Sequence, residues 1–271
     1  MVSRLRLLTD DASPGAWNMA YDRALLLGVQ RGHSPATLRF YRWSNPTVSV
    51  GYFQKVHRDF NVPLIRERGW GLVRRPSGGR GVLHWKEVTF SLVLKTGGRG
   101  LWEIFRLVHE AIGRGLEEGG IPARLLPADR DSLFSRENQK KHHNASCFAS
   151  PSRYELTLGG KKLCGTAQWQ VGDSILVHGS LPMESTCREL FEVMSFEDPD
   201  AREDAFRRAS GRMTSIYEGT RRHFAFEDLC RFMTCGFFRE WNAVIEPGEY
   251  NDFEKTIARE YAGKADESLE I

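Results

Sequence analysis

The segment RRPSGGRGVLHWKEVTFSLVL, residues 74–94, constrains the fold more than any other part of the chain. Its second half, residues 88–94, alternates apolar and polar positions before three apolar residues in a row. This pattern is typical of a strand with one or both faces buried. The first half cannot be an ordinary strand, because Gly78, Gly79 and Gly81 give up side-chain packing and cost backbone entropy. We expect such glycines where φ is positive or where something lies against bare backbone.

Length and composition indicate a globular protein. The 271 residues, 41% hydrophobic and 27% charged, suit one large domain or a domain with a small appendage. The N-terminus lacks the apolar core of a signal peptide, and no run approaches the roughly 20 apolar residues of a membrane span, so we expect a cytoplasmic protein without a membrane partner. A net charge of +3 is too mild to indicate nucleic acid binding, although an acidic partner stays open.

Strand and helix patterns are mixed along the chain without strict alternation. This mixture predicts an α+β fold with a mixed β-sheet flanked by helices. We expect helices over residues 14–31, 61–68, 101–118, 186–194, 200–212 and around 229–241, strands over 36–43 and 47–52, and a β-meander over 154–183 with hairpin turns at Gly159-Gly160 and Gly172-Asp173.

Arginines flank the glycine-rich turn, residues 74–81. Arg74, Arg75 and Arg80 surround a turn whose backbone N–H groups could form a concavity that accepts an anion, such as a phosphate or a phosphopantetheine arm. The alternative is a glycine-rich bulge with solvated arginines. A single glycine pattern does not decide between the two.

Lys161 and Lys162 are adjacent on a predicted strand, so their side chains point to opposite faces. One is expected in water, while the other would lie near the small residues 165–167. A strand lysine beside a hairpin turn is ordinarily a solubilising residue. A functional lysine here would instead neutralise a carboxylate, a phosphate or a developing oxyanion.

The cysteines are expected to be thiols, because five cysteines form neither an even set nor a CxxC pair. Cys187, Cys230 and Cys235 lie on apolar faces of predicted helices, which is typical of small buried hydrophobes. Cys147 differs, because it lies in a long polar loop, residues 127–152. Lysines and histidines at 140–143 precede it, and cationic neighbours raise the thiolate fraction of a thiol.

Histidines offer further candidates. His143 and Cys147 could ligate a metal, but no second His/Cys group has suitable spacing, so we expect no metal site. His84 and His178 each follow a predicted strand and could donate hydrogen bonds in a pocket. Either could equally be a structural histidine whose bonds are already satisfied.

Together these segments resemble the lipoate and octanoate protein ligases and transferases. The resemblance rests on WNMAYDRAL (17–25), LRFYRWSNPTVSVGYFQ (38–54), RRPSGGRGVLH (74–84), GKKLCGTAQ (160–168) and HGSL (178–181), in the family's order. It implies the catalytic fold of biotin and lipoate protein ligases over residues 1–222, with a short C-terminal helical tail, residues 223–271, packed on it. An acyl chain would lie in a tunnel between the glycine-rich turn and the lysine strand.

The resemblance also implies an activity. CFASPSRYELTLGGKK is similar to the segment where cysteine-dependent octanoyltransferases keep their nucleophile, which makes Cys147 the nucleophile and Lys162 the group that holds the carbonyl oxygen. The implied donor is octanoyl-acyl carrier protein, and the acceptor is a lysine of a lipoyl domain, in the glycine cleavage H protein or a 2-oxoacid dehydrogenase E2. No cofactor is implied, since ATP and Mg²⁺ belong to the ligases.

The residues implied to bind substrate are Arg74, Arg75, Ser77, Gly78, Gly79, Arg80, Gly81, His84, Gly165, Thr166, Ala167, His178 and Gly179. Three alternatives stay open: an ATP-dependent lipoate-protein ligase, an amidotransferase that moves octanoyl between lipoyl domains, and a non-catalytic acyl-binding module. Trp85 and Cys164 depart from the family pattern, and they bear on pocket shape and chain length.

Overall fold

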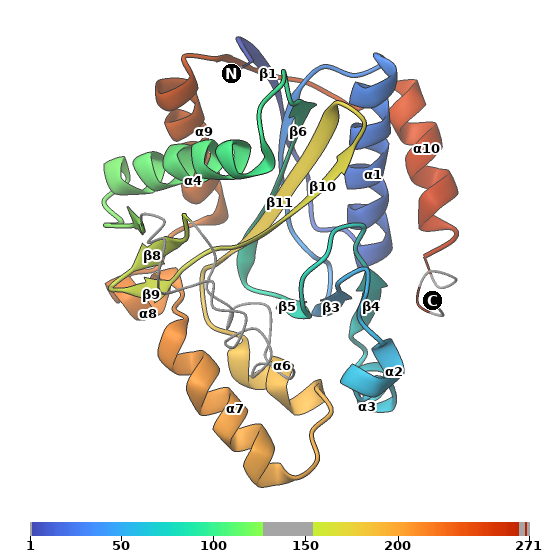
Figure 1. Cartoon of the computed structure of the whole chain (residues 1–271), viewed down its shortest axis with the longest axis vertical. Helices are drawn as coiled ribbons and strands as arrows, with labels where there is room; N and C mark the ends of the chain where they lie inside the picture. Colours follow the sequence, from blue (N-terminus) through green and yellow to red (C-terminus); the bar gives the residue numbers. More distant parts are fainter. Residues whose placement is uncertain (1, 127–153, 266–268, 270–271) are drawn as a thin grey trace.

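The strand at the end of the glycine-rich segment is β6 (Glu87–Lys95), and it runs through the middle of a six-stranded sheet (Figure 1). In this computed structural model every residue from Glu87 to Leu94 is buried, so both faces of β6 are covered, as its apolar pattern predicted. The structure describes residues 2–126, 154–265 and 269.

The central sheet is mixed. Its strands, in spatial order, are β10 (Gly165–Val171), β11 (Ser174–Pro182), β6, β2 (Thr37–Tyr41), β1 (Arg4–Thr9) and β12 (Val244–Pro247). Neighbours from β10 to β2 are antiparallel, whereas β1 is parallel to both β2 and β12. Strands β1 and β12 were not predicted, and their pairing brings the N-terminal strand beside residues 244–247, with Leu5 opposite Ile245.

Helices cover both faces of the sheet, which confirms the predicted architecture (Figure 1). On one face, α4 (Leu101–Glu118) and α9 (Phe226–Trp241) share a core with Phe90 and Leu92 of β6. On the other face α1 (Gly15–Arg31) packs on Val93. α10 (Asp252–Ala262) lies against α1, and its Glu254 forms a buried ion pair with Arg6 of β1.

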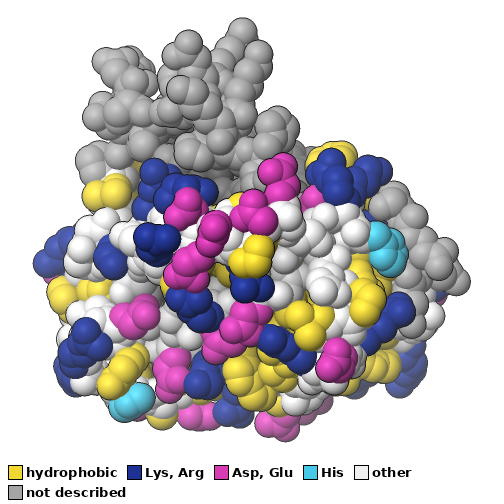
Figure 2. Space-filling model, turned by 90° about the horizontal axis from the view of Figure 1, so that it is seen from below, with side chains coloured by type: hydrophobic (Ala, Val, Ile, Leu, Met, Phe, Trp, Pro, Cys, Tyr) yellow, Lys and Arg dark blue, Asp and Glu magenta, His cyan; other side chains and the backbone are white. Residues whose placement is uncertain are grey.

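The remaining elements lie beside and below the central sheet (Figure 1). They are the sheet β4 (Gly71–Arg74), β3 (Thr47–Val50) and β5 (Val82–His84), the sheet β7 (Arg124–Leu125), β8 (Leu156–Leu158) and β9 (Lys161–Lys162), and the helices α2 (Val56–Asp59), α3 (Val62–Glu67), α6 (Cys187–Val193), α7 (Pro199–Arg212) and α8 (Ile216–Thr220). The face seen in Figure 2 intersperses basic and acidic side chains with hydrophobic ones, in keeping with the small net charge.

The prediction of one continuous meander over residues 154–183 is wrong. Both hairpin turns form, with positive φ at Gly159, Gly160 and Gly172. However, β8 and β9 belong to one sheet, and β10 and β11 belong to another. Leu163 and Cys164 are consecutive and both buried. The chain crosses between the two sheets there, so it has no solvent-exposed strand face at these residues. In the part of the chain that the structure describes, no helix is both long and apolar enough to span a bilayer.

Close contact between α4 and α9 gives a first prediction. A Cβ atom at Gly236 would lie 1.9 Å from the carbonyl oxygen of Ala111, so Gly236→Ala should force the helices apart and destabilise the protein by about 1–3 kcal/mol. Gly211, at the end of α7, has open space around it, so Gly211→Ala should be neutral or slightly stabilising. Urea unfolding of both variants measures the difference, and equal stabilities would contradict this packing.

Candidate active site

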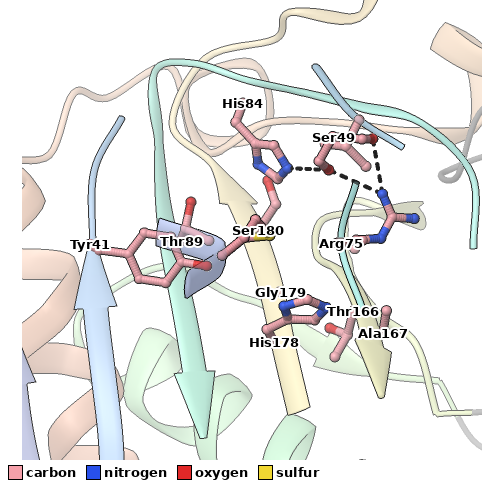
Figure 3. A pocket seen from close by; sticks show the side chains of 13 residues that line it. Tyr41, Ser49, Arg75, His84, Thr89, Thr166, Ala167, His178, Gly179 and Ser180 are labelled. Atoms are coloured by element: carbon pink, nitrogen blue, oxygen red, sulfur yellow. Dashed lines mark hydrogen bonds between the residues drawn. The ribbon is translucent and has the colours of Figure 1, made fainter. Parts of the chain in front are cut away.

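A narrow inner cavity lies between the glycine-rich segment and the strands β10 and β11 (Figure 3). Its volume is about 30 Å³, so an acyl chain that occupied it would have to part these walls. The predicted substrate-binding residues that line it are Arg75, His84, Gly165, Thr166, Ala167, His178 and Gly179. The structure thus gathers residues from three separate motifs, 74–84, 160–168 and 178–181.

His178 is held from both sides, and it lies inside β11 rather than after a strand as expected. Its Nδ1 is 3.2 Å from Asp22 Oδ2, and its Nε2 is 2.5 Å from Ser77 Oγ. Burial would raise the pKa of Asp22, but the bond with His178 and the charge of Arg39, 2.8 Å away, outweigh it and lower the pKa. The charged Asp22 fixes the tautomer in which Nδ1–H donates to it, so Nε2 accepts from the Ser77 hydroxyl.

His84, the last residue of β5, is held in the same way. Its Nδ1 is 2.7 Å from Glu87 Oε1, and its Nε2 is 2.7 Å from Ser49 Oγ. Trp43 stacks on the imidazole ring with centroids 4.2 Å apart. Both cavity histidines therefore have satisfied nitrogens and fixed orientations, so they act as rigid walls in this structure.

The glycines of the turn have separate roles. Gly79 has φ +94°, and its carbonyl oxygen would be 2.0 Å from a Cβ at Gly51, so two backbones touch there. A Cβ at Gly81 would meet the ring of Phe60 at 2.3 Å. A Cβ at Gly78 would meet no atom within 4 Å among the described residues. The carbonyl of Gly79 and the bare backbone of Gly81 therefore serve the packing of the chain itself, whereas Gly78 has open space around it.

The arginines of the turn are not solvated side chains. Arg74 and Arg75 are both buried. Arg74 donates to the carbonyl oxygens of residues 51, 52 and 54, and Arg75 donates to those of residues 49, 78 and 80. Arg80 is half-buried and contributes its carbonyl to this set. The two guanidinium groups hold the turn in shape. The alternative of a bulge with solvated arginines is therefore wrong for Arg74 and Arg75.

Gly78 lines a second, outer cavity of about 890 Å³, which shares Met19 and Arg75 with the inner one. Its φ is not positive and a Cβ would meet nothing, so Gly78→Val should leave the melting temperature near that of the wild type. If a substrate lies against this backbone, the valine should block it and lower acyl transfer. Normal transfer by the folded variant would show that the turn does not form the binding wall.

Lys161 and Lys162 differ as strand alternation predicted. Lys161 is exposed, and its Nζ is 3.4 Å from the carbonyl oxygen of Ser210. The side chain of Lys162 is only 11% exposed, and its Nζ lies 2.6 Å from Glu155 Oε1. Lys162 is not among the residues that line either cavity, but its charge acts on Cys164 and on His109, which both contact Thr166 of the inner cavity.

The neutral side chain of His109 holds Thr166 in the wall of the inner cavity. Burial lowers the pKa of His109 to about 4, so its imidazole is uncharged at neutral pH. Its Nδ1 is 2.7 Å from the carbonyl oxygen of Tyr154 and must donate there, so Nε2 accepts from the hydroxyl of Thr166 at 2.8 Å. The remaining lone pairs of Thr166 can face the cavity.

The predicted nucleophile, Cys147, lies outside the described residues. Among the cysteines within them, Cys164, Cys187 and Cys230 are buried, whereas Cys235 is exposed, so its predicted burial is wrong. Cys235 belongs to the outer side of α9 despite its apolar neighbours. Burial raises the pKa of Cys164 to about 11, which leaves this thiol next to Lys162 protonated and a poor nucleophile at neutral pH.

Two acidic residues of the site were missed. Asp22 is fully buried on α1 four residues after the equally buried Asn18, and its contact with His178 joins residues 156 positions apart, so no local signal paired them. Glu155 could have been found. A two-residue turn at 159–160 sets Thr157 opposite Lys162, which places Glu155 on the same face of the hairpin as that lysine.

These features define a class: a mixed sheet with a narrow cavity between a glycine-rich turn and the two strands that follow a buried lysine. The sequence model of the lipoyl protein ligase A/B catalytic domain matches residues 14–238. The chain therefore belongs to the lipoyl protein ligase A/B family, as the motifs indicated.

Individual relatives agree with this assignment. The chain is 35% identical to Octanoyltransferase LipM of Kyrpidia tusciae over 96% of this chain and 95% of that protein. It is 34% identical to Octanoyltransferase LipM of Bacillus cereus over 90% of each. The fold is that of a bipartite lipoate protein ligase from Thermoplasma acidophilum, with TM-score 0.79 and 21% identity over 97% and 93% of the two chains, and of an ATP-bound lipoate-protein ligase A, with TM-score 0.75 and 22% identity over 99% and 100%.

Proposed function

We propose that this protein transfers an octanoyl group from octanoyl-acyl carrier protein to the target lysine of a lipoyl domain. The observation that carries the proposal is the match to relatives named octanoyltransferase over nearly the whole of both chains. The burial of Lys162 supports the same chemistry, because a buried ammonium can stabilise an oxyanion.

The proposed reaction has two acyl transfers. The thiolate of Cys147 attacks the thioester carbonyl, a carbon–sulfur bond forms, and negative charge develops on the oxygen beside the ammonium of Lys162. Collapse of this intermediate breaks the original carbon–sulfur bond, and the pantetheine thiolate leaves and takes up a proton. The neutral amine of the acceptor lysine then attacks the Cys147 thioester, forms the amide, loses a proton and releases the thiolate.

No ATP is required in this scheme, because the donor thioester is already activated. A lipoate-protein ligase would instead use a free acid, ATP and Mg²⁺. Transfer to a lipoyl domain should therefore proceed with octanoyl-acyl carrier protein alone. Dependence on ATP and free octanoate, with no transfer from the carrier protein, would favour the ligase.

Donor competition separates the two remaining alternatives. An amidotransferase would use an octanoylated lipoyl domain as donor and should prefer it to octanoyl-acyl carrier protein. A non-catalytic acyl-binding module would retain the acyl chain without turnover. Repeated turnover with the carrier-protein donor, faster than with an octanoylated H protein, is the result we expect.

A further inference from the structure

The ion pair between Lys162 and Glu155 is one of several buried ion pairs among the described residues, together with Arg6–Glu254 and Arg39–Asp22. Its Nζ and Oε1 atoms are 2.6 Å apart, and each side chain is only 11% exposed. The pair Lys86 and Glu184 has nearly the same distance, 2.7 Å, but its side chains are 50% and 40% exposed. A buried pair carries a desolvation penalty that surface pairs avoid, so its presence calls for a reason beyond stability.

Backbone contacts fix both partners. Lys162 pairs with Thr157 in the β8–β9 hairpin, and its carbonyl oxygen accepts from the N–H of Thr214 at 3.0 Å. The carbonyl of Glu155 accepts from the N–H of Leu126 at 2.9 Å. The backbones of both residues are therefore held by β7, β8 and β9 and by the connection between α7 and α8.

A strained residue precedes Glu155. Tyr154 has φ +59°, in the left-handed region that bulky side chains rarely adopt. Its carbonyl oxygen is held by His109 Nδ1 at 2.7 Å. Such backbone persists only where the surroundings impose it, and here it directs the next residue, Glu155, toward Lys162.

The ammonium of Lys162 is largely removed from solvent, so a nearby negative charge is required to stabilise it. Burial favours the neutral form of an amine, whereas a carboxylate within hydrogen-bond distance favours the ammonium. The nearby carboxylate of Glu87 is already engaged by His84, Thr89 and Ser180. Glu155 is thus the carboxylate that the structure directs to Lys162.

We propose that Glu155 is a positioning residue for the acyl-transfer reaction: it keeps the ammonium of Lys162 charged and directed at the reacting carbonyl. An ammonium has three N–H donors, and the bond to Glu155 uses one of them, so Lys162 can hold Glu155 and the carbonyl oxygen together. This inference rests on the proposed function, because it assigns a role within that reaction.

A double-mutant cycle tests whether Glu155 acts through Lys162. Glu155→Gln should lower kcat at least about tenfold with little change in KM, and Lys162→Ala should lower it more. The double variant should be no slower than Lys162→Ala alone, because the carboxylate has no role once the amine is gone. Fully multiplicative losses would overturn the proposal.

The pH profile distinguishes positioning from a merely structural role. Removing the carboxylate removes the negative charge that favours the ammonium form of Lys162, so activity that needs the ammonium should be lost at lower pH than in the wild type. The basic limb of kcat should therefore move to lower pH in Glu155→Gln and return toward the wild type in Glu155→Asp, which keeps the charge. Glu184→Gln, which removes the exposed carboxylate beside Lys86, is the matched control and should leave the limb in place.

Amine labelling gives a readout that does not depend on octanoyl transfer. An acylating reagent reacts with neutral amines, so Glu155→Gln should increase the labelling of Lys162 near neutral pH, measured by peptide mass spectrometry, relative to Lys161 in the same sample. Unchanged labelling and an unmoved pH limb would overturn the role of Glu155. If the wild type fails to transfer octanoyl while the labelling changes as expected, the proposed function is wrong but the hold of Glu155 on Lys162 is not.

Discussion

Replacing Cys147 with alanine should abolish transfer from octanoyl-acyl carrier protein. The proposed route needs a thiolate that forms and then releases a thioester, and alanine offers no nucleophile. Serine at the same position should accept the acyl group as an oxyester that passes it on poorly, so an adduct should accumulate. Transfer to a lipoyl domain, followed by gel shift or mass spectrometry without ATP, measures both variants.

Cys164→Ala is the matched control for this experiment. Cys164 is buried and its pKa is raised to about 11, so it serves packing and not bond formation. Its alanine variant should keep most of the activity. Full ATP-independent transfer by Cys147→Ala would show that the covalent mechanism is wrong, and retention of activity only with free acid and ATP would identify a ligase.

Lys162→Ala should lower the rate of transfer by about 10²–10³, the usual cost of losing one oxyanion donor. The loss should fall on kcat more than on KM, because the ammonium is needed most when charge develops on the carbonyl oxygen. Steady-state kinetics with octanoyl-acyl carrier protein measures this effect.

Lys161→Ala supplies the comparison for Lys162. The two lysines are neighbours on β9, but Lys161 is exposed and Lys162 is buried against Glu155. The alanine variant at 161 should therefore stay within a few-fold of the wild type. Equal, small effects at both positions would mean that both lysines are ordinary strand residues.

Local sequence patterns predicted the helices, strands and turns whose residues lie within one short segment. The apolar stripe of α4, the buried run of β6 and the glycine turns at 159–160 and 172 all follow from spacing within one segment. The opposite orientations of Lys161 and Lys162 follow from strand alternation. These features depend on neighbours in the sequence, so the sequence alone was sufficient.

Features that depend on distant partners could not be predicted in this way. The pairing of β12 with β1 joins strands about 240 residues apart, and the contact of Asp22 with His178 joins α1 to β11. Arg74 and Arg75 were considered either beside an anion or solvated, and their burial against the backbone carbonyls of residues 49 and 51, more than 20 positions away, follows from no local pattern. That the glycine-rich turn and the lysine strand lie on either side of one cavity was predicted only from the family resemblance, because no local pattern relates the two segments.

The most direct test of this account is the intact mass of the protein after incubation with octanoyl-acyl carrier protein in the absence of ATP. The account predicts a mass increase of one octanoyl group, located on Cys147 by peptide mapping and removed by addition of a lipoyl domain. An unmodified protein that still transfers octanoyl, or an adduct located on another residue, would contradict it.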